Sequence, residues 1–364
     1  MPALAEKLVS RIRARGPLTF AEYMDAALYD PEHGYYTTHA RIGFEGDYLT
    51  SPELGPMFGR SLARAAADLW SALGKPAQWD LVEAGAGRGT AMRDLLRSLA
   101  HDAPAASRSA RPGIVEASPL LREEQARTLE GREMRWASSP AALAPISGVV
   151  YANEVLDAFP VHVLVRTDDG VKESFVDEKD GRLVEVLRAP SHSDLRWRVP
   201  QALPAGGRWE VSPAAEGWVA SLASAVASGY VLFVDYGDDE AGLLARHGAG
   251  TVRGFARHRL LEDPFAAPGE HDLTATVNFT AIARAAEGAG LRLVGATTQR
   301  DALLALGARD ATARSGDPRE QLRSASRRAA TDLLLDPNGL GGFRVVLYAK
   351  EVGAAAPAWI TARP

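Results

Sequence analysis

The stretch Leu81-Val82-Glu83-Ala84-Gly85-Ala86-Gly87-Arg88-Gly89-Thr90 decides the fold class of this chain. It begins as a short apolar run, carries glycines at alternate positions and ends where a helical pattern starts. Glycine lets a backbone turn sharply and approach a ligand closely, and the first turn of the following helix presents free N–H groups. The stretch therefore predicts a strand, a ligand-binding loop and a helix, which open a nucleotide-binding α/β fold.

Acidic residues beside these glycines distinguish between possible ligands. A dinucleotide fingerprint would place its third glycine at position 90, where Thr90 stands. Glu83 would repel a pyrophosphate but attract the amino group and sulfonium of S-adenosylmethionine. Glu116 ends the next predicted strand, where it can accept hydrogen bonds from ribose hydroxyls, and Ser138 follows the third strand, where it can flank an adenine ring. We predict an S-adenosylmethionine site; a dinucleotide loop or a structural turn are the alternatives. The predicted cofactor-binding residues are Glu83, Gly85, Gly87, Gly89, Glu116, Ala117, Ser138 and Asn153.

Short apolar runs alternate with helical patterns from residue 79 onward. This alternation predicts a mainly parallel sheet with helices on both faces. Residues 161–188 instead alternate with period two and carry turn signals at Asp168-Asp169-Gly170 and Asp180-Gly181, which predicts an antiparallel hairpin insertion. The expected division is an N-terminal helical and lid segment (1–76), a Rossmann-like domain (77–352) with insertions at about 158–228 and 237–278, and a flexible tail (353–364). Residues 103–112 are expected to form a flexible loop.

The N-terminal segment carries a helix signal and a candidate lid. Thr19, with Glu22 at the capping-box position, predicts a helix that starts at Phe20. Residues 46–53 are predicted to cover the cofactor with Thr50 and Ser51 as polar contacts, although a packed loop that caps the next helix is the alternative. Tyr36 is a further candidate for lining the cofactor pocket.

Composition excludes several classes of function. The chain has 364 residues, a net charge of −5 and no cysteine, which removes disulfides, thiolate metal sites and cysteine nucleophiles. The negative net charge argues against nucleic acid as a partner. No pair of histidines has the spacing of metal ligands. The N-terminus lacks the apolar core of a signal peptide, and no apolar run is long enough to cross a bilayer. The expected location is therefore cytoplasmic, without a membrane partner and without a metal.

Candidate catalytic residues follow two of the later strands. Asn153, Glu154 and Asp157 come directly after the apolar run 148–152, and Asp235 ends the run 230–234. Ligands bind at the carboxyl edge of open α/β sheets, and carboxylates there suit a cationic or hydrogen-bonding acceptor. The alternatives are a helix cap for Asp157 and a structural role for Asp235.

Several sequence blocks resemble the MidA-type methyltransferases. They include Gly16-Pro-Leu-Thr-Phe-Ala-Glu-Tyr-Met24, Asp30-Pro-Glu-His-Gly-Tyr-Tyr36, Gly46-Asp-Tyr-Leu-Thr-Ser-Pro-Glu53, Glu83 to Thr90, Ala152-Asn-Glu-Val-Leu-Asp-Ala-Phe-Pro160, Glu210-Val-Ser-Pro213, Val234-Asp-Tyr-Gly237 and Asp272-Leu-Thr-Ala275. The resemblance spans nearly the whole chain. It implies a class I methyltransferase fold and methylation of a protein arginine side chain. Independently of the resemblance, a homodimer is one assembly that we consider.

Two other functions fit the same resemblance less closely. One is methylation of a small molecule on oxygen or nitrogen, and the other is a non-catalytic assembly factor that binds a partner protein. The chain departs from the family pattern at Thr276 and Asn278, where members commonly have a histidine and an aspartate. This departure puts the identity of the acceptor in doubt but leaves the cofactor motif intact. Enzymes that methylate amino groups of nucleic acids resemble one another in an Asn/Asp-Pro-Pro-aromatic motif after the fourth strand. This chain has Asn153-Glu154-Val155-Leu156 at that position, which argues against a nucleic acid acceptor.

Overall fold

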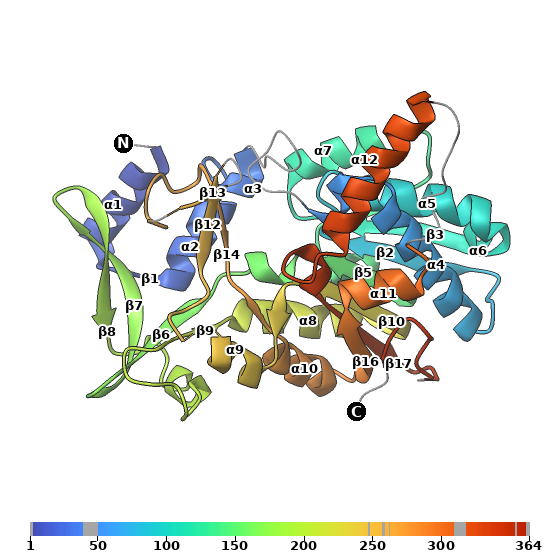
Figure 1. The fold of residues 1–364 in the computed structure, drawn as a ribbon. Helices are drawn as coiled ribbons and strands as arrows, with labels where there is room; N and C mark the ends of the chain where they lie inside the picture. Colours follow the sequence, from blue (N-terminus) through green and yellow to red (C-terminus); the bar gives the residue numbers. More distant parts are fainter. Residues whose placement is uncertain are drawn as a thin grey trace.

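A seven-stranded sheet of order β16-β17-β10-β5-β2-β3-β4 forms the larger part of the structure (Figure 1). This computed structural model describes residues 3–38, 50–246, 248–256, 259–261, 263–308, 318–353 and 355–361. The strands of the sheet are β2 (Trp79–Ala84), β3 (Ala110–Val115), β4 (Arg135–Ala137), β5 (Ile146–Asn153), β10 (Val226–Asp235), β16 (Arg292–Thr298) and β17 (Arg344–Lys350). Strands β4, β3, β2, β5 and β10 are parallel, and β17 runs antiparallel between β10 and β16.

Helices cover both faces of this sheet because successive strand residues are apolar. Along β2, Leu81 packs into one core cluster and Val82 into the other. The first cluster includes side chains of α4 (Met57–Ala72), α5 (Thr90–Asp102) and α11 (Gln299–Ala305), and the second includes side chains of α8 (Pro213–Ala225) and α10 (Phe279–Gly288). The remaining helices beside this sheet are α6 (Pro104–Ser109), α7 (Pro119–Thr128) and α12 (Pro318–Leu334). Strands buried on both faces are typical of a parallel α/β sheet, which confirms the predicted fold class.

A second, antiparallel sheet lies on the left in Figure 1, beside the N-terminal helices. Its order is β1-β7-β6-β9, with β8 paired to β7. It consists of β1 (Leu18–Thr19), β6 (His162–Thr167), β7 (Gly170–Lys179), β8 (Arg182–Arg188) and β9 (Arg208–Val211). The predicted antiparallel hairpin insertion is confirmed. Helices α1 (Ala3–Arg15) and α2 (Phe20–Tyr29) share a core cluster with Val161, Val163 and Val176, so the N-terminal segment packs against the insertion.

The remaining elements are short. They are α3 (Tyr35–Thr38), α9 (Glu240–Arg246), β11 (Gly237–Asp238), β12 (Arg253–Ala256), β13 (Arg259–Leu260), β14 (Asp272–Thr274), β15 (Val277–Asn278) and the 3-10 helices η1 (Ser51–Leu54), η2 (Pro140–Leu143), η3 (Leu156–Ala158), η4 (Leu195–Arg198) and η5 (Leu340–Gly342). Leu273 of β14 packs in the same cluster as α1 and α2. None of the helices in the described ranges is both long enough and apolar enough to cross a bilayer.

The structure confirms one local prediction from the sequence and contradicts another. The capping box of Thr19 and Glu22 is present at the start of α2, as predicted. The prediction of a flexible loop at 103–112 is wrong, because these residues form α6 and the start of β3, and the Trp79 indole N–H donates to the carbonyl of Ala106 at 3.0 Å. Within the segment expected to be a flexible tail, Trp359 and Ile360 are buried in the core cluster of the large sheet.

Candidate active site

The cofactor loop and the loop after β5 meet at the carboxyl edge of the sheet. Strand order places β2 between β3 and β5, so the chain leaves β2 in one direction and returns to β5 in the other. Ligands of open α/β sheets bind at such a switch point. Contact between the loops is close: a methyl group added at Gly85 would lie 2.5 Å from Cγ2 of Val155. The two sets of residues singled out by the sequence therefore lie in contact at this edge.

The glycine loop has a backbone that other residues rarely adopt. Gly85, Gly87 and Gly89 have φ values of 67°, 50° and 81°. Gly85 is exposed, and its N–H donates to the carbonyl of Val115 at 2.9 Å, which ties the loop to the end of β3. Gly89 is buried and precedes α5, so the first turn of that helix follows the loop directly. The loop thus has the left-handed glycine backbone and the following helix that the sequence predicts, while its contact with a ligand stays a prediction.

Glu83 is a buried acid with one carboxylate oxygen that accepts no hydrogen bond. It lies on β2 with 3% of its surface exposed, and its Oε2 has no hydrogen-bond partner. Burial raises the pKa of Glu83 to about 8, and the negative charge of Glu116 acts in the same direction. Hydrogen bonds with the Met92 backbone and the Tyr151 side chain oppose this rise in the pKa. A buried carboxylate oxygen without a geometric partner is costly, and a ligand that pairs with it would explain its retention. The amino group of S-adenosylmethionine fits this need, whereas a pyrophosphate does not.

Glu116 stands at the end of β3 with both oxygens engaged. Its Oε1 accepts the Ser118 N–H at 2.9 Å, and its Oε2 accepts from the Gln125 side chain at 2.9 Å. Burial raises the pKa of Glu116, and these donors oppose the rise. Each carboxylate oxygen has a second lone pair, so Glu116 can still accept ribose hydroxyls. Ala117 and Ser138, at the ends of β3 and β4, are exposed beside it.

The loop after β5 holds Glu154 in a strained backbone conformation. Its φ is 53°, a value that non-glycine residues adopt infrequently. The Glu154 Oε1 accepts the Ser51 N–H at 3.2 Å and the Asn153 side-chain N–H at 2.9 Å. Burial raises the pKa of Glu154 to about 7, and the charge of Asp272 adds to the rise. Strain of this kind is kept where the surroundings enforce it, which is common at functional sites.

Four carboxyl groups, Glu154, Asp157, Asp235 and Asp272, form what we call the acid cluster. Asp157 is 8% exposed, and its Oδ1 has no hydrogen-bond partner. Burial and the charge of Glu154 together raise the pKa of Asp157 to about 7. Within the described part of the chain, no lysine or arginine forms an ion pair with Glu154, Asp157 or Asp235. The Oδ1 of the buried Asn153 is also without a partner. The cluster is thus suited to a cation from outside the chain.

Asp235 differs from the other members of the cluster. It is 1% exposed, and its Oδ2 accepts the backbone N–H groups of Val155 at 3.1 Å and Leu156 at 2.9 Å. Its Oδ1 accepts the N–H of Tyr236 at 2.9 Å. Burial raises the pKa of Asp235, with Asp157 adding to the rise and the backbone donors opposing it. The structure therefore places this predicted catalytic residue as a brace that holds the loop after β5.

Asp272 is the member that sequence reasoning missed as a site residue. It begins β14 in the second insertion and accepts a hydrogen bond from the Tyr36 hydroxyl at 2.9 Å. The Tyr36 carbonyl accepts from the Ser118 hydroxyl at 2.7 Å. Tyr36 thus lies between the cofactor side and the acid cluster, where the sequence predicted only a pocket-lining role. The one available signal for Asp272 was its position in a family sequence block.

The predicted lid residues are only partly described. Residues 46–49 lie outside the described ranges, and Thr50 precedes η1 without a side-chain capping bond. The Ser51 side chain is fully buried, and its hydroxyl bonds to the Gln299 amide at 3.0 Å. The Ser51 hydroxyl therefore binds α11, while its N–H binds Glu154. The side chain of Ser51 is not placed to contact a cofactor.

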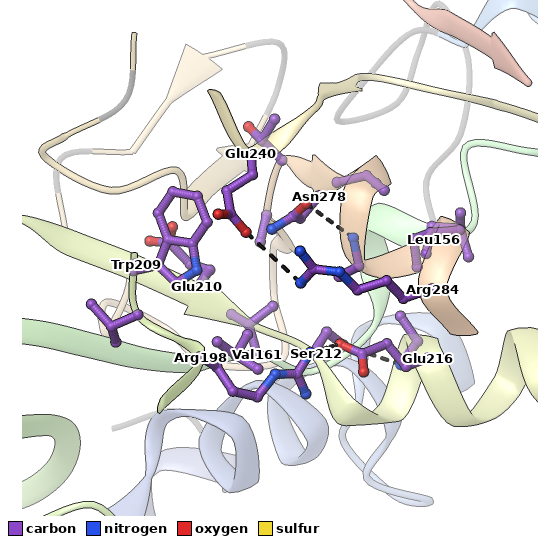
Figure 2. Close-up of a pocket in the computed structure, with 18 of the residues that line it drawn as sticks. Leu156, Val161, Arg198, Trp209, Glu210, Ser212, Glu216, Glu240, Asn278 and Arg284 are labelled. Atoms are coloured by element: carbon purple, nitrogen blue, oxygen red, sulfur yellow. Dashed lines mark hydrogen bonds and ion pairs between the residues drawn. The ribbon is translucent and has the colours of Figure 1, made fainter. Parts of the chain in front are cut away.

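A separate pocket is lined in part by Leu156, which follows β5 in the chain (Figure 2). It has a volume of about 290 Å³ and is lined by residues of β9, α8 and α10, with Leu156 on its wall. Ion pairs of Arg198 with Glu216 and of Arg284 with Glu240 cross its rim, as Figure 2 shows. Thr276 and Asn278 line this pocket, so the departures from the family pattern are found here.

Asn278 also has a structural task. Its Oδ1 accepts the Ala281 N–H at 3.2 Å and caps the N-terminus of α10. Asparagine and aspartate cap helices about equally well, so an asparagine at this position preserves the cap.

The fold defines a class I methyltransferase, and S-adenosylmethionine is its cofactor. The chain belongs to the MidA-type family of S-adenosyl-L-methionine-dependent methyltransferases, whose family model matches residues 61–297. It is 32% identical over 333 residues to the mitochondrial protein arginine methyltransferase NDUFAF7 of Xenopus tropicalis, covering 84% of this chain and 75% of the relative. It is 33% identical over 318 residues to the protein of that name from Homo sapiens, covering 77% and 68%.

A solved structure gives the same result. A protein from Burkholderia thailandensis bound to S-adenosyl-homocysteine has a TM-score of 0.88 and 32% identity to this chain, covering 97% of this chain and 93% of that one. The protein is therefore an enzyme whose cofactor is S-adenosylmethionine, as predicted. The prediction of a cytoplasmic location is contradicted, because the relatives compared above are named as mitochondrial proteins.

Proposed function

We propose that this enzyme methylates an arginine side chain of a protein substrate. The observation that carries the proposal is the acid cluster, in which Asp157 and Asn153 keep buried oxygens without partners and no described cation pairs with Glu154. The relatives in the comparison are named as protein arginine methyltransferases, which supports the same acceptor. A guanidinium is planar, permanently charged and rich in N–H donors, so it complements clustered carboxylates.

The pKa values of the cluster suit a charged acceptor. Burial holds the pKa of Glu154 and of Asp157 at about 7, so without the acceptor these carboxyl groups are partly protonated at neutral pH. An arriving guanidinium favours their ionised form because opposite charges lower the pKa of a carboxyl group. Glu154, held by Ser51 and Asn153, then orients the reacting nitrogen and takes the proton that this nitrogen loses as its bond to carbon forms. Asp157 stabilises the charge that remains.

The cofactor side supplies the methyl group. S-adenosylmethionine contributes an electrophilic methyl whose bond to sulfur breaks during transfer. We assign Glu83 to its amino group, the backbone of Gly85, Gly87 and Gly89 to its amino acid portion, and Glu116 to its ribose. Ala117 and Ser138 flank its adenine. Asn153 lies at the end of β5 between the two sides and can contact either.

Labelling tests the acceptor class. The enzyme is incubated with S-adenosylmethionine that carries an isotope-labelled methyl group and with a cell lysate, and label is compared in the protein and small-molecule fractions. We expect label in protein and, after complete hydrolysis, in methylated arginine. Glu154→Gln is the matched control and should lose this label. Label confined to small molecules, or to lysine, would refute the proposal; no label, with S-adenosyl-homocysteine bound normally, would favour a non-catalytic assembly factor.

A further inference from the structure

Gln125 connects two parts of the cofactor site that are far apart in the sequence. It lies on α7 with its side chain fully buried. Its Nε2 donates to the carbonyl of Gly87 at 2.9 Å and to the Oε2 of Glu116 at 2.9 Å. A primary amide has two N–H bonds, so each acceptor receives one. The glycine loop after β2 and the acid after β3 are thereby joined through one side chain.

The orientation of this amide follows from its partners. A carbonyl oxygen and a carboxylate oxygen are both acceptors, so the nitrogen of Gln125 must face them and the oxygen must point away. That oxygen, Oε1, is buried and has no partner. An unsatisfied buried amide oxygen costs free energy, and its retention indicates that the two bonds made by the nitrogen carry a benefit.

Packing allows α7 to reach the loop. Gly89 is in contact with this helix: a methyl group added there would lie 3.4 Å from Cα and 3.5 Å from Cγ of Gln125. The same neighbourhood has a second, exposed connection, because Arg88 pairs with Glu124 at 2.6 Å. The buried connection and the exposed one come from adjacent residues of α7, which makes them a natural pair for comparison.

We propose that Gln125 is a positioning residue for the cofactor, which sets the separation between the Gly87 backbone and the Glu116 carboxylate. These groups are assigned to two portions of one ligand, the amino acid portion and the ribose, so an error in their separation weakens both contacts at once. The two bonds of Gln125, one of them to a charged acceptor, also orient the carboxylate before the cofactor arrives. Gln125 itself need not touch the cofactor.

Binding of S-adenosyl-homocysteine by calorimetry tests this proposal. Gln125→Met keeps the length and approximate volume of the side chain but removes both donors, and we expect about tenfold weaker binding. Glu124→Gln is the matched control, since it removes only an exposed ion pair, and should bind within about twofold of the natural protein. Should Gln125→Met not fold, Gln125→Glu provides the same shape with an acceptor in place of the donor and should also weaken binding. Unchanged affinity in a folded variant would overturn the proposal.

A pH profile separates positioning from general loss of structure. The donation from Gln125 lowers the pKa of Glu116, against the rise caused by burial. The other charged or titratable groups that act on or respond to Glu116 are Glu83 on β2, Arg122 on α7 and Tyr29 on α2. Without Gln125, Glu116 takes up a proton at a higher pH, so the loss of affinity in Gln125→Met should be larger at pH 6 than at pH 8. A loss that is equal at both values would show a purely structural effect and would refute the positioning role.

Discussion

The Asp235 carboxylate accepts the backbone N–H of Leu156 at 2.9 Å, which fastens the loop after β5 to the end of β10. The same oxygen accepts the N–H of Val155 at 3.1 Å, and the other accepts the N–H of Tyr236. Strand pairing alone would leave these donors without partners. The acid cluster therefore depends on a neighbouring strand for the shape of the loop that carries it.

Removal of this brace should affect both stability and catalysis. Asp235→Ala leaves three backbone N–H groups without an acceptor in a buried place, and we expect a loss of about 3 kcal/mol in the free energy of unfolding. Methyl transfer should also fall strongly, because Glu154 and Asp157 are part of the loop that Asp235 holds in place. Chemical denaturation and labelled-methyl incorporation are the measurements. A variant as stable as the natural protein would show that the bonds of Asp235 contribute little.

Binding of the cofactor should release a proton from Glu83. Burial raises the pKa of Glu83 to about 8, so this carboxyl group is mainly protonated at pH 7 and must ionise to pair with an ammonium group. Affinity for S-adenosyl-homocysteine should therefore rise as the pH increases toward 8. Calorimetry in two buffers with different ionisation enthalpies measures the released proton, and Glu83→Gln should abolish most of this release and weaken binding. Equal proton release in the variant would assign the titration to another group.

The glycine loop should not tolerate a branched side chain. Gly87 has a φ of 50°, and a valine there would be strained and would fill the space beside the ligand. We expect Gly87→Val to show no measurable binding of S-adenosyl-homocysteine. Gly181→Val is the control, because its φ of 78° imposes a similar strain in the distant turn between β7 and β8. It should lower stability but leave binding intact; if both variants bind normally, the assigned loop is not the cofactor site.

Ionised Glu154 should lower the free energy of unfolding, although we assign it a catalytic role. Its pKa is raised from 4.5 to about 7 in the folded protein, so the folded state binds more protons than the unfolded chain between these values. This group's contribution to stability is therefore most favourable below pH 4.5 and is lost as the pH rises through 7. At pH 8, Glu154→Gln should be more stable by about 1–2 kcal/mol, after allowance for its partial exposure. At pH 4.5 the two proteins should unfold alike.

The same variant tests the catalytic assignment. Cofactor affinity in Glu154→Gln should remain within a few-fold, because its contacts are with Ser51 and Asn153 and not with the glycine loop. Methyl transfer should fall by about two orders of magnitude, as is usual when a general base is removed. Normal turnover would remove Glu154 from the mechanism, and lost affinity would move it to the cofactor side.

Local sequence was sufficient to predict the fold class, the cofactor and the proposed cofactor half of the site. The strand, glycine loop and helix from Leu81 to Thr90 lie within one short segment, and the chemistry of Glu83 and Glu116 follows from their places at strand ends. Steric limits on φ and the polarity of a helix N-terminus act over a few residues, so the fold class and the cofactor follow from the order of the amino acids alone. The capping box at Thr19 is local in the same way.

Only the tertiary structure could reveal the contacts of the proposed acceptor half. Asp272 reaches the cluster through an insertion, Asp235 proves to bind backbone N–H groups, and Gln125 meets Gly87 across 38 positions of sequence. Burial also raised the pKa values of Glu154 and Asp157, and no pattern in the sequence measures burial at a junction of two sheets. Periodicity and turn chemistry are short-range, whereas packing and electrostatics depend on which distant segments come together. The sequence thus predicted which cofactor binds, and the assembled fold showed which carboxyl groups surround the proposed acceptor position.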